Sequence, residues 1–186
     1  LEASSAASDV YKRQGADILI GNAGNDILNG GSDRDDMRGG EGNDTYIVDN
    51  FRDVIREGSN QGTDLVQSSA NYILRDSDLE NLTLKGSEDI NGTGNASANT
   101  IKGNSGANIL RGEGGADILI GNAGNDILFG GSGNDRLVGG DGIDKLTGGV
   151  GNDIFQISSG VGRDVITDYT SGCLLYTSDA ADDASS

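Results

Sequence analysis

The chain of 186 residues contains no proline, no histidine and no tryptophan, and it has a single cysteine, Cys173. Without proline it is neither collagen-like nor a proline-rich linker. Without histidine it cannot build a Ser-His or Cys-His catalytic pair, and zinc has no suitable set of ligands. Aromatic residues make up only 4% of the chain, which argues against a conventional globular core. Nothing in the sequence therefore points to an enzyme.

Basic residues are also scarce. Lysine and arginine number 13 against 30 aspartates and glutamates, for a net charge of -17 and a pI near 4.1. Nucleic acids and anionic membranes both require a basic patch, so we expect this segment to bind no nucleic acid and to insert into no membrane. Cations are the expected partners.

What the chain has in abundance is glycine, 32 residues of it, arranged in a nine-residue repeat. Residues 112–156 divide into GEGGADILI, GNAGNDILF, GGSGNDRLV, GGDGIDKLT and GGVGNDIFQ. Nine residues advance an α-helix by two and a half turns, so the repeat would form no single helical face. The sixth place is always aspartate, and the eighth place is always a large apolar residue: Leu119, Leu128, Leu137, Leu146 and Phe155.

Each unit has two halves of different chemistry. The first six residues are rich in glycine, which allows the backbone to turn sharply. The last three resemble a short strand, in which the eighth place points inward and its neighbours point outward. Two units complete one coil. The pattern predicts an all-β fold, a parallel β-roll or β-solenoid.

The pattern GGxGxDxUx resembles the RTX (repeats-in-toxin) calcium-binding nonapeptide repeat family of secreted, hemolysin-type bacterial proteins. The resemblance implies Ca²⁺ as the cofactor, with each loop contributing half a site. It implies that loops two units apart share an ion, which pairs Asp117 with Asp135, Asp135 with Asp153, and Asp126 with Asp144. It further implies backbone carbonyl ligands, which on this chain would be those of Gly121, Gly130, Gly131, Gly133, Gly139, Gly140 and Gly142.

The repeat is already present near the start of the chain. Residues 15–47 carry Asp17, Asp26, Asp35 and Asp44 at the aspartate place. The Asp26 and Asp44 pair matches the pattern. The Asp17 and Asp35 pair is expected to be weaker, because Asp33 replaces a glycine and the first loop is incomplete.

Stacked strands lie roughly 4.8 Å apart, so aspartates on the same edge should face each other at about that spacing. At an effective dielectric constant near 20, two such charges repel by about 3 to 4 kcal/mol. We therefore expect the coil to be strained open without a cation. Calcium accepts six to eight oxygen ligands in flexible geometry, whereas magnesium requires a tighter octahedron.

We expect two rolls, 15–47 and 93–157, joined by a degenerate insert at 48–92 and followed by an exit strand at 158–172. The insert is interpreted either as degenerate coils or as a short strand insert, with Asp49, Asp53 and Asp64 as solvated turn residues rather than ligands. Asn99 and Asn108 stand at the aspartate place, where they would coordinate more weakly and partly cap the second roll. The ends, 1–14 and 173–186, lack glycine. They resemble translated sequencing-adapter sequence or are natural disordered tails, and we expect them to lie outside the fold.

The sequence thus predicts a calcium-binding module that folds on ion capture and stabilises or displays a larger secreted bacterial protein. Extracellular location and type I secretion are what the family resemblance implies. The alternatives are an accessory module of a secreted protease, lipase or mannuronan C5-epimerase, or a part of an RTX toxin or adhesin. An outward apolar stripe is either half-covered by its neighbours or a docking face for another domain or a second roll: Ile118, Ile120, Ile127, Phe129 and Val138.

Overall fold

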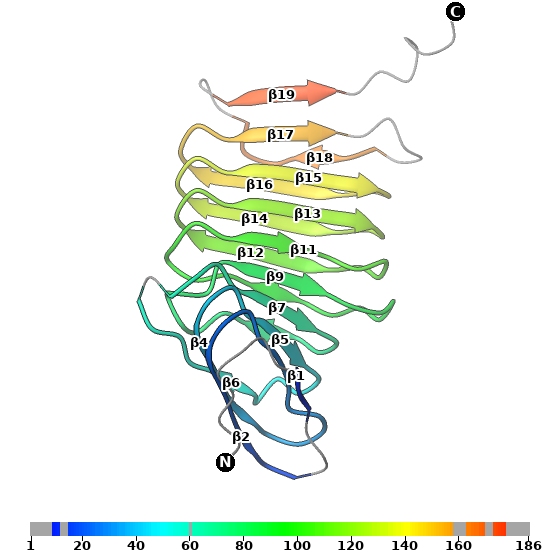
Figure 1. Cartoon of the computed structure of the whole chain (residues 1–186). Helices are drawn as coiled ribbons and strands as arrows, with labels where there is room; N and C mark the ends of the chain where they lie inside the picture. The colour runs from blue at the N-terminus through cyan, green and yellow to red at the C-terminus, as the bar shows by residue number, and fades with distance from the viewer. Residues whose placement is uncertain (1–8, 12–14, 60, 158–162, 170–172, 178–186) are drawn as a thin grey trace, which may run out of the picture.

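The computed structural model describes residues 9–11, 15–59, 61–157, 163–169 and 173–177. Within this part the chain forms strands and turns and no helix, and every pair of neighbouring strands is parallel. The strands stack one above another as the chain winds from its blue to its red end (Figure 1). The molecule is a β-solenoid, which confirms the predicted fold class.

One sheet runs the whole length of the described coil. It is formed by β1 (Asp9–Tyr11), β3 (Ile27–Asn29), β5 (Thr45–Val48), β7 (Leu65–Ser68), β9 (Asn81–Leu84), β11 (Thr100–Lys102), β13 (Ile118–Ala123), β15 (Arg136–Asp141), β17 (Ile154–Ile157) and β19 (Leu174–Thr177).

The other face of the coil is divided into two sheets. The first contains β2 (Ile18–Ala23), β4 (Asp36–Glu41) and β6 (Val54–Ile55). The second contains β8 (Tyr72–Ile73), β10 (Gly92–Thr93), β12 (Ile109–Gly114), β14 (Ile127–Ser132), β16 (Lys145–Val150) and β18 (Val165–Ile166). The break lies between β6 and β8, and in Figure 1 the blue strands β2, β4 and β6 run obliquely to the strands above them.

The pairing register in the regular repeats is 18 residues. Ile118 pairs with Arg136, and Arg136 pairs with Ile154. Two nonapeptides make up this length, so each residue of a unit stacks on its equivalent in the next coil. The eighth-place residues therefore line up inside the roll.

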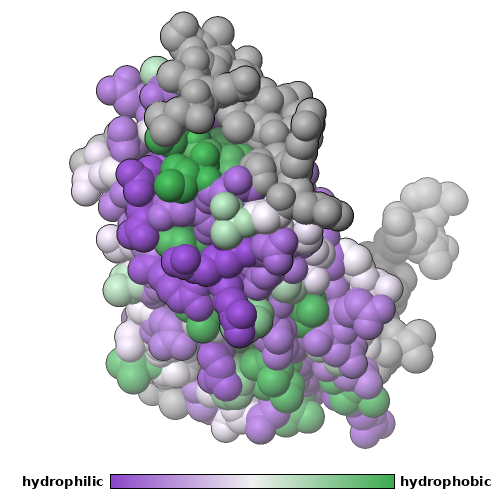
Figure 2. Space-filling model, turned by 90° about the horizontal axis from the view of Figure 1, so that it is seen from below, coloured by the Kyte–Doolittle hydropathy of each residue, from purple (hydrophilic) through white to green (hydrophobic). Residues whose placement is uncertain are grey.

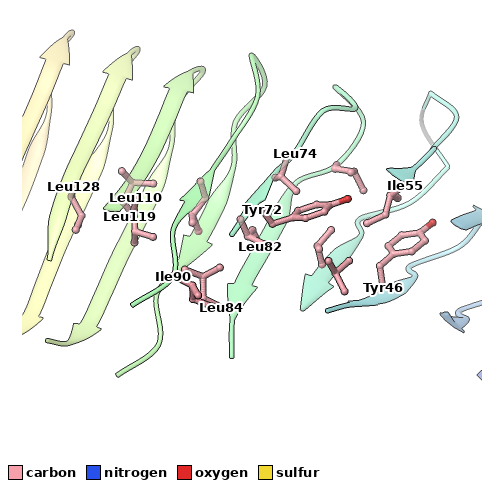
Figure 3. Close-up of a cluster of buried hydrophobic side chains, with 14 of the residues drawn as sticks. Tyr46, Ile55, Tyr72, Leu74, Leu82, Leu84, Ile90, Leu110, Leu119 and Leu128 are labelled. Carbon is pink, nitrogen blue, oxygen red and sulfur yellow. The ribbon is translucent and has the colours of Figure 1, made fainter. Parts of the chain in front are cut away.

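The core is a ladder of single side chains between the two faces. Leu119, Leu128, Leu137, Leu146 and Phe155 are all 0% exposed. In Figure 3, Leu110, Leu119 and Leu128 from opposite faces point into the same narrow interior, with Tyr46 and Ile55 nearer the N-terminal end. Full burial of one such side chain contributes roughly 1.5 to 3 kcal/mol. The repeat thus builds its core mainly from leucines, with a few aromatic residues such as Tyr46 and Phe155.

Residues 48–92 continue the coil. Strands β7 and β9 extend the long sheet, but the spacing between stacked residues changes to 20 between Asp44 and Asp64 and to 16 between Asp64 and Glu80. The division of the chain into separate domains stays a prediction.

Parts of both end segments lie on the sheet, contrary to our expectation. Strand β1 pairs with β3, and β19 pairs with β17 next to the buried Cys173. The physical reason is that the exposed edges of a parallel sheet offer unpaired backbone groups to any extended segment nearby. The rest of both ends lies outside the described residues, and their non-native origin stays a prediction.

The surface of the lower end of the coil is mostly hydrophilic, with small separate hydrophobic areas (Figure 2). The predicted outward stripe is half-buried at all five positions, and the guanidinium of Arg111 lies 4.3 Å from the ring centre of Phe129. A docking function for the stripe stays a prediction. None of the residues that the structure describes belongs to a helix able to cross a membrane.

Candidate metal sites

The aspartates at the sixth place stand just before the strands and form two rows along the coil. Asp135 Oδ1 accepts the backbone N–H of Asp117 at 2.9 Å, and Asp153 Oδ1 accepts that of Asp135 at 3.0 Å. In the second row, Asp144 Oδ1 accepts the N–H of Asp126 at 2.8 Å. The predicted pairs are therefore brought together, each through one carboxylate oxygen.

The same geometry occurs in the first repeats. Asp44 Oδ1 accepts the N–H of Asp26 at 2.7 Å, and Asp35 Oδ1 accepts the N–H of Asp17 at 2.9 Å. Asp33 adopts a φ of 89°, the left-handed conformation that the missing glycine would have supplied. Aspartate is one of the few other residues that reach this region at modest cost. The irregular loop thus still brings its aspartates into register.

In five aspartates of these rows, the second carboxylate oxygen is buried without a hydrogen-bond partner among the described residues. This holds for Oδ2 of Asp44, Asp117, Asp126, Asp135 and Asp144. A buried carboxylate oxygen that has lost water and gained no partner is costly for the fold. The arrangement leaves one oxygen of each of these five aspartates available to a cation.

A backbone carbonyl oxygen lies beside this oxygen at three aspartates of the second roll, Asp117, Asp126 and Asp135. A Cβ atom built on Gly112 would overlap both Asp117 Oδ2 and the carbonyl oxygen of Gly130. The same holds at Gly121, for Asp126 Oδ2 and the Gly139 carbonyl oxygen. The first-place glycine thus keeps open a small space lined by carboxylate and carbonyl oxygens, the ligand set that a hard cation such as Ca²⁺ prefers.

The other predicted carbonyl ligands lie in different surroundings. The carbonyl oxygen of Gly121 lies beside Asn108 Oδ1 at Gly103, and those of Gly131 and Gly133 lie against Gly149 and Gly151. The α-carbons of Gly140 and Gly142 lie against the carbonyl groups of Asn122 and Gly124 in the coil before. Gly130 and Gly139 are therefore the predicted carbonyls that converge with an aspartate.

Burial makes these carboxyl groups weaker acids than an exposed aspartate. It raises the pKa of Asp117 and of Asp126 to about 6, and the charges of Asp135 and Asp144 add to the effect. The N–H groups of Asn99 and Asn108 lower each pKa in part. Repulsion along the row was the effect predicted from the sequence, but loss of water is the larger cause of the shift.

Our interpretation of Asp53 and Asp64 as solvated turn residues is wrong. They are 0% and 1% exposed, and their Oδ1 atoms accept the N–H groups of Asp35 and Asp44 at 3.0 and 2.7 Å. Both continue the aspartate rows, because a coil lengthened by two residues keeps Asp64 in register. The signal was the apolar residue two places on, Ile55 and Val66. Asp49 is exposed, as expected.

Asn99 and Asn108 occupy the aspartate place but satisfy both of their side-chain atoms within the protein. Their Nδ2 groups donate to the carbonyl oxygens of Leu79 and Ile90, at 2.9 and 2.6 Å. Their Oδ1 atoms accept the N–H groups of Asn95 and Asn104. Each asparagine side chain therefore has hydrogen-bond partners for both its oxygen and its nitrogen. By contrast, Asp117 and Asp126 leave Oδ2 without a partner among the described residues.

Comparison with known families identifies this arrangement. The model of the RTX calcium-binding nonapeptide repeat matches residues 13–46, 93–128 and 129–166, which together make up more than half of the chain. No curated protein matches the chain. With the nine-residue spacing, the coil and the oxygen-lined spaces all in agreement, the chain belongs to the RTX calcium-binding nonapeptide repeat family, whose repeats bind Ca²⁺.

Proposed function

We propose that the chain is the calcium-binding module of a larger secreted bacterial protein and that it folds when it captures calcium after export. The observation that carries this proposal is the row of buried aspartate oxygens without hydrogen-bond partners. The buried carboxylates destabilise the folded state until a cation neutralises them. Calcium binding would then supply free energy of folding.

The side-chain ligands in this proposal are the sixth-place aspartates of both rolls: Asp17, Asp26, Asp35, Asp44, Asp117, Asp126, Asp135, Asp144 and Asp153. Support comes from the geometry of the rows, in which Oδ1 of one aspartate accepts a hydrogen bond from the backbone N–H of the aspartate in the coil before it. The carbonyl oxygens of Gly130 and Gly139 are the best-placed backbone ligands, because each lies beside an aspartate oxygen. Asp53 and Asp64 join the set on the same geometry.

Calcium concentration would control the change of state. Extracellular calcium modules bind with dissociation constants of about 0.1 to 1 mM. In the calcium-poor cytosol the acidic loops would remain unneutralised and the chain extended, a state suited to export. Outside the cell the loops would fill and the coil would close. The support for secretion is the family, whose members are typically exported by type I secretion.

The test is a calcium titration of the whole chain followed by far-ultraviolet circular dichroism. In chelator we expect little β-sheet signal, and on adding calcium we expect a cooperative gain. Magnesium at the same concentrations serves as the control and should produce a much smaller change. A chain that is fully β-structured in chelator would contradict the proposal.

A further inference from the structure

Three carboxylates gather where the first stretch matched by the family model, residues 13–46, gives way to coils that the model does not cover. Asp44, Glu57 and Asp64 each offer one oxygen, and these oxygens lie within 4.8 Å of one another. Asp44 precedes β5, Asp64 precedes β7, and Glu57 follows β6, the last strand before the second face breaks. The cluster therefore lies where the first roll meets the degenerate coils.

The oxygens of this cluster have lost water and gained few partners. Asp44 is 1% exposed; its Oδ1 accepts the N–H of Asp26, and its Oδ2 has no hydrogen-bond partner among the described residues. Both carboxylate oxygens of Glu57 are buried, and neither has a hydrogen bond of good geometry among the described residues, although the N–H groups of Gly39 and Gly40 lie near enough to affect the pKa of Glu57. A buried, unpartnered carboxylate oxygen directed at two further carboxylates is the arrangement expected of a cation ligand.

Among the residues that the structure describes, no lysine or arginine forms an ion pair with Asp44, Glu57 or Asp64. The ion pairs of the described coil nearest in sequence join Arg38 and Arg56 to Asp36. The pKa of Glu57 is raised to about 8, chiefly by burial and also by the charges of Asp64 and Asp44, while the N–H groups of Gly40 and Gly39 act in the opposite direction. Within the described part of the chain, these carboxylates can therefore be neutralised by protons or by a bound cation, and not by a basic side chain.

Glu57 stands in a place that the repeat reserves for glycine. It follows Gly39 by 18 residues, as Gly130 follows Gly112. In the regular coil the residue at this place brings its carbonyl oxygen next to the aspartate Oδ2. A Cβ on Gly39 would overlap Asp44 Oδ2 and Tyr46 Oη, so the usual space is kept open here as well. Glu57 adds a carboxylate to this space, and its N–H is held by Asp76 Oδ2 at 3.1 Å.

We propose that Asp44, Glu57 and Asp64 form a three-carboxylate calcium site that binds more tightly than the aspartate pairs of the regular repeats. The proposal rests on the calcium-dependent function proposed above and adds to the repeat aspartate Asp44 a ligand from outside the repeat pattern, Glu57. The number of charged ligands is one of the features that set calcium affinity in proteins. The site would fill first and fasten the first roll to the degenerate coils at the break between β6 and β8.

Isothermal titration calorimetry of the full chain with Ca²⁺ tests the site. Glu57→Gln removes one charge and keeps the size of the side chain. Glu88→Gln removes one charge from an exposed glutamate and is the matched control. We expect the tightest class of sites in the original chain to weaken about tenfold or more in Glu57→Gln and to be unchanged in Glu88→Gln.

Terbium luminescence measures metal binding at this site directly. The chain contains no tryptophan, so bound Tb³⁺ is excited through tyrosine, and Tyr46 lies beside Asp44. We expect Glu57→Gln to lower tyrosine-sensitised terbium emission at low Tb³⁺ and Glu88→Gln to leave it unchanged. We also expect Glu57→Gln to raise the melting temperature of the calcium-free chain, because it removes the cost of burying an ionisable carboxyl group and the repulsion from Asp64 and Asp44.

The outcomes separate this site from the general function. If Glu57→Gln binds calcium like the original chain while Asp135→Asn loses binding, the three-carboxylate site is refuted and the regular sites stand. If both glutamate variants weaken binding equally, the effect is one of net charge and the site is again refuted. If the original chain binds no calcium, the proposed function fails first.

Discussion

The first-place glycine and the sixth-place aspartate act together. In the unit that begins at Gly112, the absence of a side chain leaves space for Asp117 Oδ2 and for the carbonyl oxygen of Gly130 from the next coil. The same unit contains Gly114, where an added Cβ would meet Ala96 only at the ordinary contact distance of 3.8 Å. Two glycines two residues apart therefore differ in what they contribute to the site.

Gly112→Ala should destabilise the calcium-bound chain by about 1 to 3 kcal/mol, the usual cost of forcing extra atoms into a packed region, and should weaken calcium binding. Gly114→Ala is the control and should be neutral or slightly stabilising. Urea denaturation in calcium together with a calcium titration measures both effects. Equal destabilisation by the two substitutions would show that the first-place glycine has no special function.

The sequence predicts most of this residue-level arrangement, because aspartate recurs at a fixed step. It does not predict Glu57, which stands in a stretch without the glycine frame. Only the three-dimensional coil brings Glu57 next to Asp44, 13 residues earlier, and Asp64, seven residues later. Asp53 and Asp64 were recognisable from the apolar residue two places on, but the loss of glycine around them favoured a solvated interpretation.

Each strand of the regular repeats from β11 to β17 contributes one fully buried apolar side chain to the core. In β16, Leu146 is 0% exposed, whereas Val150 at the end of the same strand is 75% exposed. The alternation of the strand predicts which residue points inward. Coil lengths are less predictable, since the change from 18 to 20 and then 16 residues is absorbed in turns that have no fixed composition.

Leu146→Ala should lower the free energy of unfolding by about 2 to 5 kcal/mol, because it removes buried methyl groups and leaves a cavity in the ladder. Val150→Ala should change it by less than about 0.5 kcal/mol. Chemical denaturation in saturating calcium compares the two variants within one strand. A small effect of Leu146→Ala would mean that the metal sites, and not the core ladder, hold the coil.

The whole molecule carries a net charge of -17, and much of that charge is buried in two rows. Burial raises the pKa of Asp117 and Asp126 from 3.8 to about 6 in the folded chain. Between these values the unfolded chain loses its protons while the folded chain retains them. The folded state is therefore favoured at low pH and loses this advantage as the pH rises through about 6.

Acid should accordingly replace part of the effect of calcium. We expect the calcium-stripped chain to gain β-sheet signal in circular dichroism as the pH is lowered from 7 to 4.5. In saturating calcium the dependence should reverse, since bound calcium requires ionised carboxylates and competes with protons. A calcium-free chain whose β-sheet signal decreases towards pH 4.5 would contradict the electrostatic account of the aspartate rows.

The 18-residue pairing step also limits how such a gene can lengthen. Duplication of two consecutive units would add one complete winding and leave everything beyond it facing the same way. Duplication of a single unit would turn the remainder of the protein by half a winding, so that any neighbouring domain would emerge from the opposite side. Tracts of this kind should therefore grow by pairs of units wherever the orientation of the next domain matters to the organism.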